Sequence, residues 1–205
     1  MDFPRTVDEI TPEWLTQILR DSGAIEGEQV VAINVGDMRG EQGHMADVSR
    51  IEVEYDSPSE KSPRTLIVKS KRAALDPEWA KFAYPMYERE VEIYRGHDSD
   101  FNVRLPKCHF AEYDPETTAM AIVLEDLGHL RTEREEDDLS LDDGLSIIRY
   151  LAQLHASWWG KPNGDNYSWL SEEPTVWKNE VAESIYQENV EGFLEYYGDY
   201  LPPGV

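Results

Sequence analysis

A lysine and a glutamate form the pair of residues in this sequence that is best suited to chemistry. Lys69 directly follows the apolar residues 66–68, so its side chain leaves a predicted buried strand. Because an ammonium group buried without a partner costs free energy, Lys69 needs a carboxylate nearby. Glu90 lies on the apolar stripe of the helix predicted after that strand, whereas Glu88 and Glu92 point elsewhere. We predict a Lys69–Glu90 ion pair; the alternative is an edge lysine in water and a boundary glutamate.

A second candidate is the end of the apolar run at residues 119–124. Six apolar residues bounded by turn residues fit a buried strand better than a helix. Glu125, Asp126 and Leu127 follow this strand directly, and a glycine comes next. The chain is strand-rich before this point and helical after it. We therefore predict a joint between two differently built halves, with backbone groups free to bind a flat ring such as adenine.

A glycine-bearing loop is a third candidate. Residues 36–46 contain three glycines and connect predicted strands at 29–35 and 47–55. Glycine lets backbone N–H groups approach a phosphate, because no Cβ stands in the way. The same glycines also suit a plain hairpin turn, and the sequence leaves both interpretations open.

The elements that position these residues form an α+β fold. Thr11 suits the N-cap of a first helix with Pro12 at its first position, and Gly23 is the expected stop. Five strands are predicted, at residues 29–35, 47–55, 65–69, 105–113 and 119–124. One helix lies between the third and fourth strands, and helices at 141–159 and 176–197 follow the joint.

Composition and charge exclude several classes of protein. With 40% apolar and 30% charged residues the chain is an ordinary globular sequence. No apolar run could span a bilayer and the N-terminus lacks a signal-peptide core, so we expect a cytoplasmic protein without a membrane partner. Cys108 is the single cysteine, which excludes an intramolecular disulfide. The formal charge of -23 argues against nucleic-acid binding; it suits either steering of a cationic substrate or a solvating acidic surface.

The order of these features resembles the phosphotransferase enzyme family. This is the aminoglycoside phosphotransferase and choline kinase group, including its CHK (ecdysteroid-kinase-like) branch. The resemblance rests on five features over roughly residues 10–160: the glycine-bearing hairpin, TLIVKS, YEREVEIYR, the strand ending in LEDL, and LAQLHASWW. It implies a protein-kinase-like fold with a five-stranded antiparallel N-lobe sheet and one main helix. The N-lobe is expected at 1–124, the hinge at 125–130, and the first helices of an incomplete helical C-lobe at 131–205.

The resemblance also implies roles in binding ATP. Lys69 looks like the strand lysine that grips the α- and β-phosphates, and Glu90 looks like the helix glutamate that orients it. Gly40 and Gly43 look like the loop over the phosphates, although GEQG is not the GxGxxG of protein kinases.

The resemblance also implies roles for the joint after residue 124 and for a later histidine. Glu125 and Leu127 look like the hinge, which offers a backbone C=O and N–H to the adenine edge. His155 matches a structural position of the family, in agreement with its place on the apolar face of a predicted helix. A packed, hydrogen-bonded histidine is therefore expected there rather than a catalytic one.

The catalytic part of the family pattern is absent from this sequence. The family carries an HGDxxxxN segment and a later aspartate, which accept the substrate proton and hold Mg²⁺ against the phosphates. Here the nearest candidate is Asn163-Gly164-Asp165, and Leu170 stands where the asparagine belongs. We expect a kinase that uses ATP and Mg²⁺ and phosphorylates a hydroxyl on a small molecule, with a cationic acceptor favoured by the acidity. The catalytic residues and metal ligands are expected outside these 205 residues, so the chain alone should not turn over.

Two other functions stay open. The chain fits a non-catalytic kinase-like module that binds nucleotide or a partner, and downstream coding sequence with HGD-x4-N would argue against it. It also fits an acidic scaffold without a ligand, which requires Lys69 and Glu90 to lie far apart. An incomplete C-lobe should expose apolar surface around Trp158 and Trp159, and this favours self-association.

Overall fold

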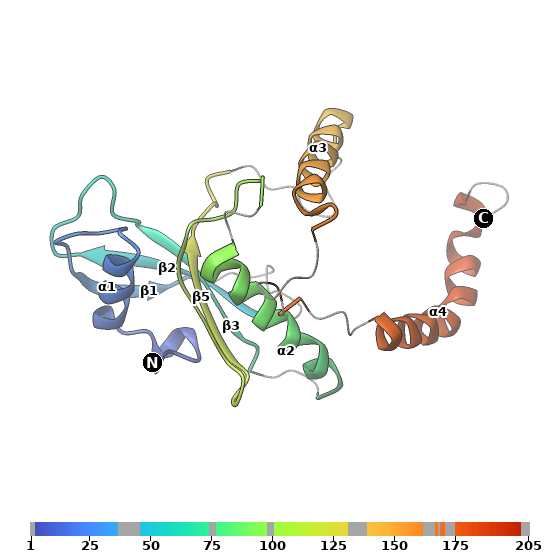
Figure 1. Cartoon of the computed structure of the whole chain (residues 1–205), viewed down its shortest axis with the longest axis horizontal. Coiled ribbons are helices and arrows are strands. Elements are labelled where there is room, and N and C mark those ends of the chain that lie inside the picture. Colours follow the sequence, from blue (N-terminus) through green and yellow to red (C-terminus); the bar gives the residue numbers. More distant parts are fainter. Residues whose placement is uncertain are drawn as a thin grey trace. The chain divides into compact units, whose positions relative to one another are not determined.

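The computed structural model describes most of the chain in two compact units. The described residues are 3–36, 46–73, 77–97, 101–130, 139–161, 167, 169–170 and 175–201, without the side chains of 77–83, 97, 175–181 and 199. The first unit spans residues 1–162 and the second spans residues 163–205. The first unit contains the sheet and three of the helices labelled in Figure 1.

An antiparallel sheet forms the centre of the first unit. Its strands are β1 (Val30–Val35), β2 (Ala46–Tyr55), β3 (Thr65–Lys71), β4 (Cys108–Asp114) and β5 (Ala119–Glu125). They lie in the order β1-β2-β3-β5-β4, and each neighbouring pair is antiparallel. The predicted α+β class with a five-stranded antiparallel sheet is confirmed. β3 runs two residues beyond Lys69, and β4 begins three residues later than predicted.

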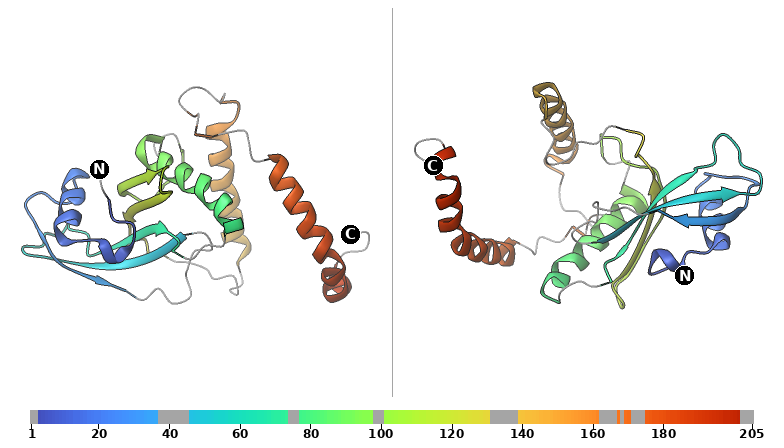
Figure 2. Two further views of the ribbon diagram at one scale, coloured as in Figure 1. Left: turned by 90° about the horizontal axis from the view of Figure 1, so that it is seen from below. Right: turned by 180° about the vertical axis from the view of Figure 1, so that it is seen from behind.

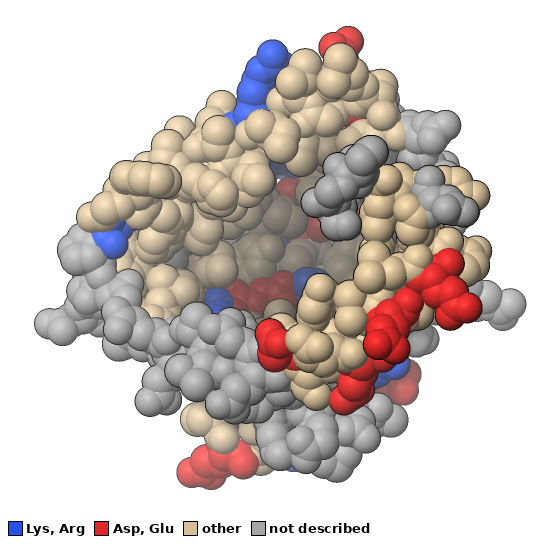
Figure 3. All heavy atoms as spheres, turned by 90° about the vertical axis from the view of Figure 1, so that its right-hand side faces the viewer, with Lys and Arg blue, Asp and Glu red and all other residues tan. Residues whose placement is uncertain are grey.

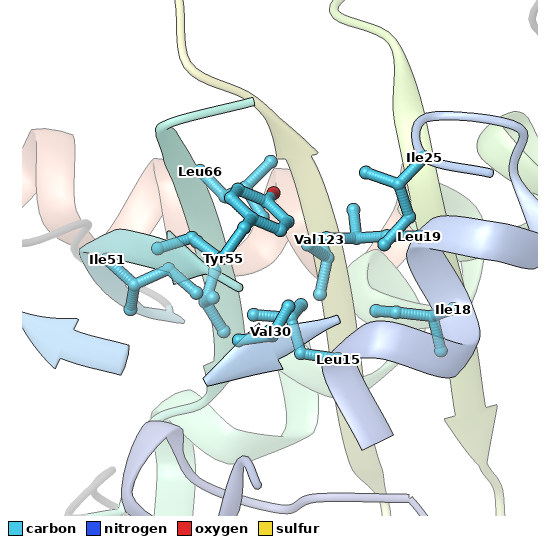
Figure 4. Close-up of a cluster of buried hydrophobic side chains, with 11 residues drawn as sticks. Leu15, Ile18, Leu19, Ile25, Val30, Ile51, Tyr55, Leu66 and Val123 are labelled. Carbon is cyan, nitrogen blue, oxygen red and sulfur yellow. The ribbon is translucent and has the colours of Figure 1, made fainter. Parts of the chain in front are cut away.

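Helix α1 (Pro12–Asp21) covers one face of the sheet and follows a short 3-10 turn at Val7–Glu9. It begins as predicted, because the Thr11 hydroxyl accepts a hydrogen bond from the Trp14 N–H at 3.2 Å. Gly23 has a φ of 66°, a left-handed conformation that suits glycine just after a helix. Figure 4 shows the core between α1 and the sheet, to which nine labelled side chains belong: Leu15, Ile18, Leu19, Ile25, Val30, Ile51, Tyr55, Leu66 and Val123.

Helix α2 (Pro77–Glu92) covers the opposite face, as the views in Figure 2 show, and continues into a π-helical turn at Ile93–His97. Tyr87 and Val91 are buried and pack against Met120 and Ile122 of β5. Helical spacing predicts Met86 on the same apolar stripe as Glu90, and this prediction is wrong, because the Met86 side chain is 49% exposed. Because Met86 and Tyr87 are both apolar, periodicity alone cannot choose between two helix faces that are one residue apart.

Helix α3 (Leu141–Trp158) forms where predicted, with Ser140 as its N-cap. None of its residues is buried, and His155 is exposed, so the prediction of a packed His155 is wrong. An apolar stripe is buried only where another element covers it. Near its C-terminal end, α3 contacts residues 101 and 102. The Ser157 hydroxyl accepts from the Asn102 N–H at 3.3 Å, and the rings of Phe101 and Trp158 lie 5.3 Å apart.

The second unit contains helix α4 (Thr175–Tyr197), near the predicted bounds, and a 3-10 turn at Gly198–Tyr200. Among its side chains, the rings of Phe193 and Tyr197 have centroids 5.0 Å apart. No helix among the described residues is both long and apolar enough to cross a membrane.

Candidate functional site

Lys69 and Glu90 meet between β3 and α2. The Lys69 Nζ lies 2.6 Å from Glu90 Oε1, and the two side chains are 29% and 30% exposed. The predicted ion pair is therefore present, although its two residues are 21 positions apart in the sequence. Both side chains keep contact with solvent, so a ligand can reach the pair.

The alternation of β3 places Lys69 on the α2 face. Leu66, Val68 and Ser70 are buried on the α1 face, and Lys69 points the other way. Across the sheet Lys69 lies opposite Val48 of β2 and Ile122 of β5. The strand therefore fixes the direction of the lysine side chain before any contact with α2 forms.

Two neighbours limit what else the pair can contact. Lys71, the next cation on the same face, donates to the Thr118 hydroxyl at 2.7 Å and is thereby held at the β4–β5 turn. Tyr94 follows α2 and is half-buried; burial, and next the charge of Glu90, raise the pKa of its phenol to about 12. Tyr94 is therefore uncharged near neutral pH and adds no negative charge beside Glu90.

Residues 125–130, predicted as the hinge, begin where β5 ends. The Glu125 N–H donates to the Lys107 carbonyl at 2.8 Å, and the Leu127 carbonyl accepts from the Leu130 N–H at 2.8 Å. The Glu125 carboxylate accepts from the Lys107 N–H at 3.1 Å and from Arg104 at 2.9 Å. The Lys107 N–H is the main reason that the pKa of Glu125 lies below its ordinary value; burial opposes it and Arg104 adds to it. Both ends of the hinge backbone are thus fixed.

Asp126 fixes the middle of the predicted hinge. Its Oδ2 accepts from Arg50 Nε at 2.7 Å and lies 2.6 Å from Arg50 Nη2, while Oδ1 accepts from the Gly128 N–H at 2.8 Å. The Asp126 side chain is 5% exposed and that of Arg50 is 45% exposed. Burial acts to raise the pKa of Asp126, but hydrogen bonds from Thr65, Gly128 and Arg50 outweigh it and lower the pKa. Asp126 therefore stays charged and ties the hinge to β2.

Sequence reasoning missed the Arg50–Asp126 contact. Arg50 and Asp126 are 76 residues apart, and no local pattern in the sequence connects them. The available signal was Asp126 itself, because a carboxylate directly after a buried strand needs a donor. Gly128 belongs to the same arrangement, since a Cβ there would lie 3.0 Å from Asp126 Oδ1 and 3.3 Å from Arg50 Nη2.

The predicted phosphate loop is described only at its ends. Gly40 and Gly43 lie outside the described residues. Gly36 donates its N–H to the Arg50 carbonyl at 2.8 Å, and a Cβ at Gly36 would lie 3.1 Å from that oxygen. At the other end Ala46 is paired with Lys71 on β3. The loop therefore returns to the sheet two residues from Lys69.

A metal centre was not expected within this chain. In the described ranges, no three or more His, Cys, Asp or Glu side chains gather closely enough to hold a metal ion. The expected use of Mg²⁺ and the position of its ligands stay predictions.

The comparisons with known proteins agree with the fold. A search of curated proteins found no match. The profile of the ecdysteroid kinase-like family matches residues 40–202, which include Lys69, Glu90, the predicted hinge and most of the sheet. This is the branch that the order of motifs resembles, and its kinase-like character supports a phosphotransferase type of function. The chain belongs to the ecdysteroid kinase-like family.

Proposed function

We propose that this chain is the nucleotide-binding part of an ATP-dependent kinase that phosphorylates a hydroxyl group on a small molecule. The observation that carries the proposal is the 2.6 Å contact between Lys69 and Glu90. Phosphoryl transfer depends chiefly on positioning the phosphates and neutralising their charge, and a lysine held by a glutamate does both.

The pair leaves donors for a ligand. A lysine ammonium has three N–H donors, and the Glu90 contact uses one of them. Because Lys69 is 29% exposed, its remaining donors can reach phosphate oxygens. Glu90 thus holds the Lys69 side chain in place, and Lys69 binds the α- and β-phosphates of ATP.

The register of β3 and β5 supports the hinge assignment. Leu66 is the partner of Glu125, and Lys69 lies three residues further along β3. At the rise of an extended strand this is about 10 Å, which one nucleotide can bridge from its base to its phosphates. We assign the adenine contacts to the Glu125 C=O and the Leu127 N–H, and the phosphate cover to Gly40 and Gly43.

The remaining parts of the reaction are assigned by family resemblance. Mg²⁺ accompanies ATP, and the base and metal ligands belong to an HGDxxxxN segment that these 205 residues do not contain. The formal charge of -23 favours a cationic acceptor through long-range attraction. We also propose a cytoplasmic location, because ATP is available there.

Calorimetric titration with MgADP tests the nucleotide site. Lys69→Met should weaken binding about tenfold or more, because it removes a charge-assisted hydrogen bond to phosphate. Lys161→Met is the matched control, since Lys161 is an exposed lysine whose Nζ lies over the Trp158 ring. Equal affinity of Lys69→Met and the unsubstituted protein would refute the role of Lys69, and absence of binding to the unsubstituted protein would refute the nucleotide site.

A second candidate function is a non-catalytic kinase-like module that binds a partner. The observation in its favour is the apolar surface of α3, where Leu141 is 79% exposed and Ile148 is 60% exposed; Trp159 just beyond is 85% exposed. Self-association through this surface would appear as a concentration-dependent mass in sedimentation equilibrium. Leu141→Glu with Ile148→Glu should then give a monomer, and a monomer before substitution would count against self-association.

A further inference from the structure

A cavity of about 440 Å³ lies behind the predicted hinge. Four segments line it: the turn after α1 at residues 23–24, the connection that leads into β3, the beginning of β4, and residues 125–126 at the end of β5. Helix α1 covers the sheet face opposite to Lys69. The cavity is therefore distinct from the surroundings of the Lys69–Glu90 pair.

Three cations line this cavity: Lys61, Arg64 and Lys107. They are three of only 19 basic residues in a chain with 42 acidic ones. On the face in Figure 3 several acidic side chains form a row, whereas Lys and Arg side chains are scattered singly. A cavity that gathers three cations is thus unusual for this molecule and would attract an anion.

Within the described ranges, these three side chains have no internal counter-ion. Among the described residues, no hydrogen bond or ion pair of the Lys61, Arg64 or Lys107 side chain is recorded. Two carboxylates also line the cavity, but Glu125 is paired with Arg104 and Asp126 with Arg50. The charge that remains available to a ligand is positive.

His109 lines the same cavity and feels the charge of Lys107. Its Nδ1 lies 2.9 Å from the Ser22 hydroxyl oxygen, and the ring lines the cavity. Burial is the main reason that the pKa of His109 falls to about 4; the nearby charge of Lys107 lowers it further, and the charge of Glu125 opposes both effects. His109 is therefore neutral near pH 7, and its pKa will respond to any anion that offsets the charge of Lys107.

We propose that this cavity binds a small anion with a phosphate group, held by Lys61, Arg64 and Lys107. An arginine guanidinium and two ammonium groups supply the charge-assisted donors that a phosphate dianion accepts. The cavity is large enough for a phosphate ester of a small organic molecule. The proposal does not depend on nucleotide binding at Lys69.

Titration with inorganic phosphate tests the cavity by calorimetry and by NMR of the histidine rings. Phosphate should bind to the unsubstituted protein and to Lys69→Met alike. The double variant Lys61→Gln with Arg64→Gln should bind it about tenfold more weakly, because two charged donors are lost. Arg149→Gln with Lys161→Gln removes the same charge from exposed positions outside the cavity lining and should leave the affinity unchanged.

The His109 resonance provides a readout at the site, assigned by its loss in His109→Gln. Saturating phosphate should raise the His109 pKa above about 4, because a bound anion offsets Lys107. No phosphate binding, or equal weakening in both double variants, would overturn the proposal. Loss of binding in Lys69→Met would assign the phosphate to the nucleotide site instead, and tighter binding of citrate than of phosphate would overturn the choice of phosphate as the ligand group.

Discussion

The Lys69–Glu90 pair and the Arg50–Asp126 pair are both short, yet they leave different groups free. In the first pair both side chains are about equally exposed, at 29% and 30%, and one carboxylate oxygen makes the recorded contact. In the second pair the carboxylate is 5% exposed and accepts bonds from Arg50 and from the Gly128 N–H. Lys69 keeps N–H donors that can bind a ligand. The Asp126 carboxylate is already occupied by hydrogen bonds and is suited to fixing the backbone. From this difference we propose that Lys69 serves ligand binding and that Asp126 serves stability.

Asp126→Ala should have the largest effect on stability. It leaves the Gly128 N–H and Arg50 without their acceptor, at a cost of about 2 kcal/mol of unfolding free energy. Urea unfolding followed by circular dichroism measures this loss. Asp126→Asn keeps the shape and one acceptor oxygen and should lose less; equal stability of Asp126→Ala and the unsubstituted protein would remove Asp126 from its structural role.

Lowering the pH should reproduce part of that loss. The folded-state pKa of Asp126 lies below the ordinary 3.8, so its contribution to stability is present above pH 3.8 and is lost as the pH falls through the folded value. The loss should be smaller than in Asp126→Ala, because a protonated Asp126 keeps its shape. Between pH 7 and pH 3, the unfolding free energy of Asp126→Asn should decline less steeply than that of the unsubstituted protein. Parallel curves for the two proteins would show that other carboxylates control the decline.

Gly128→Ala should destabilise the same arrangement more mildly. The added Cβ would lie 3.0 Å from Asp126 Oδ1, so the carboxylate must shift and its bond to Arg50 weakens. A loss of about 1 kcal/mol is expected from strain of this kind. Gly27→Ala is the matched control, because a Cβ there meets no atom within 4 Å. Thermal unfolding of both variants measures the difference, which would be absent if Asp126 were free to move.

Lys69→Met should change stability least and ligand binding most. A pair that is roughly one-third exposed contributes about 0.5 kcal/mol. The thermal unfolding midpoint should therefore barely move while the affinity for MgADP falls. A large loss of stability with unchanged nucleotide affinity would reverse the roles that we assign to the two pairs.

The two pairs also show what sequence alone can predict. Lys69 and Glu90 were found because each stands out locally as a charge on an otherwise apolar strand or helix face. The Arg50–Asp126 pair depends on the sheet order, which places β2 next to β3 and β3 next to β5, and local periodicity does not contain that order. The choice between Met86 and Tyr87, and the exposure of His155, likewise depend on which neighbouring element covers a helix. Gly40 and Gly43 lie outside the described residues, so their role stays a prediction.

The sheet order has a consequence for how the protein folds. β1, β2 and β3 are joined consecutively, so their contacts close short loops. The pairing of β3 with β5 must instead close the chain from Lys71 to Ala119, which includes α2, at a larger cost in chain entropy. We expect β5 to join after β1–β3, so that the hinge reaches Lys69 late in folding. Pulse-labelled hydrogen exchange would show β5 amides gaining protection after those of β2, and simultaneous protection would argue for a single concerted step.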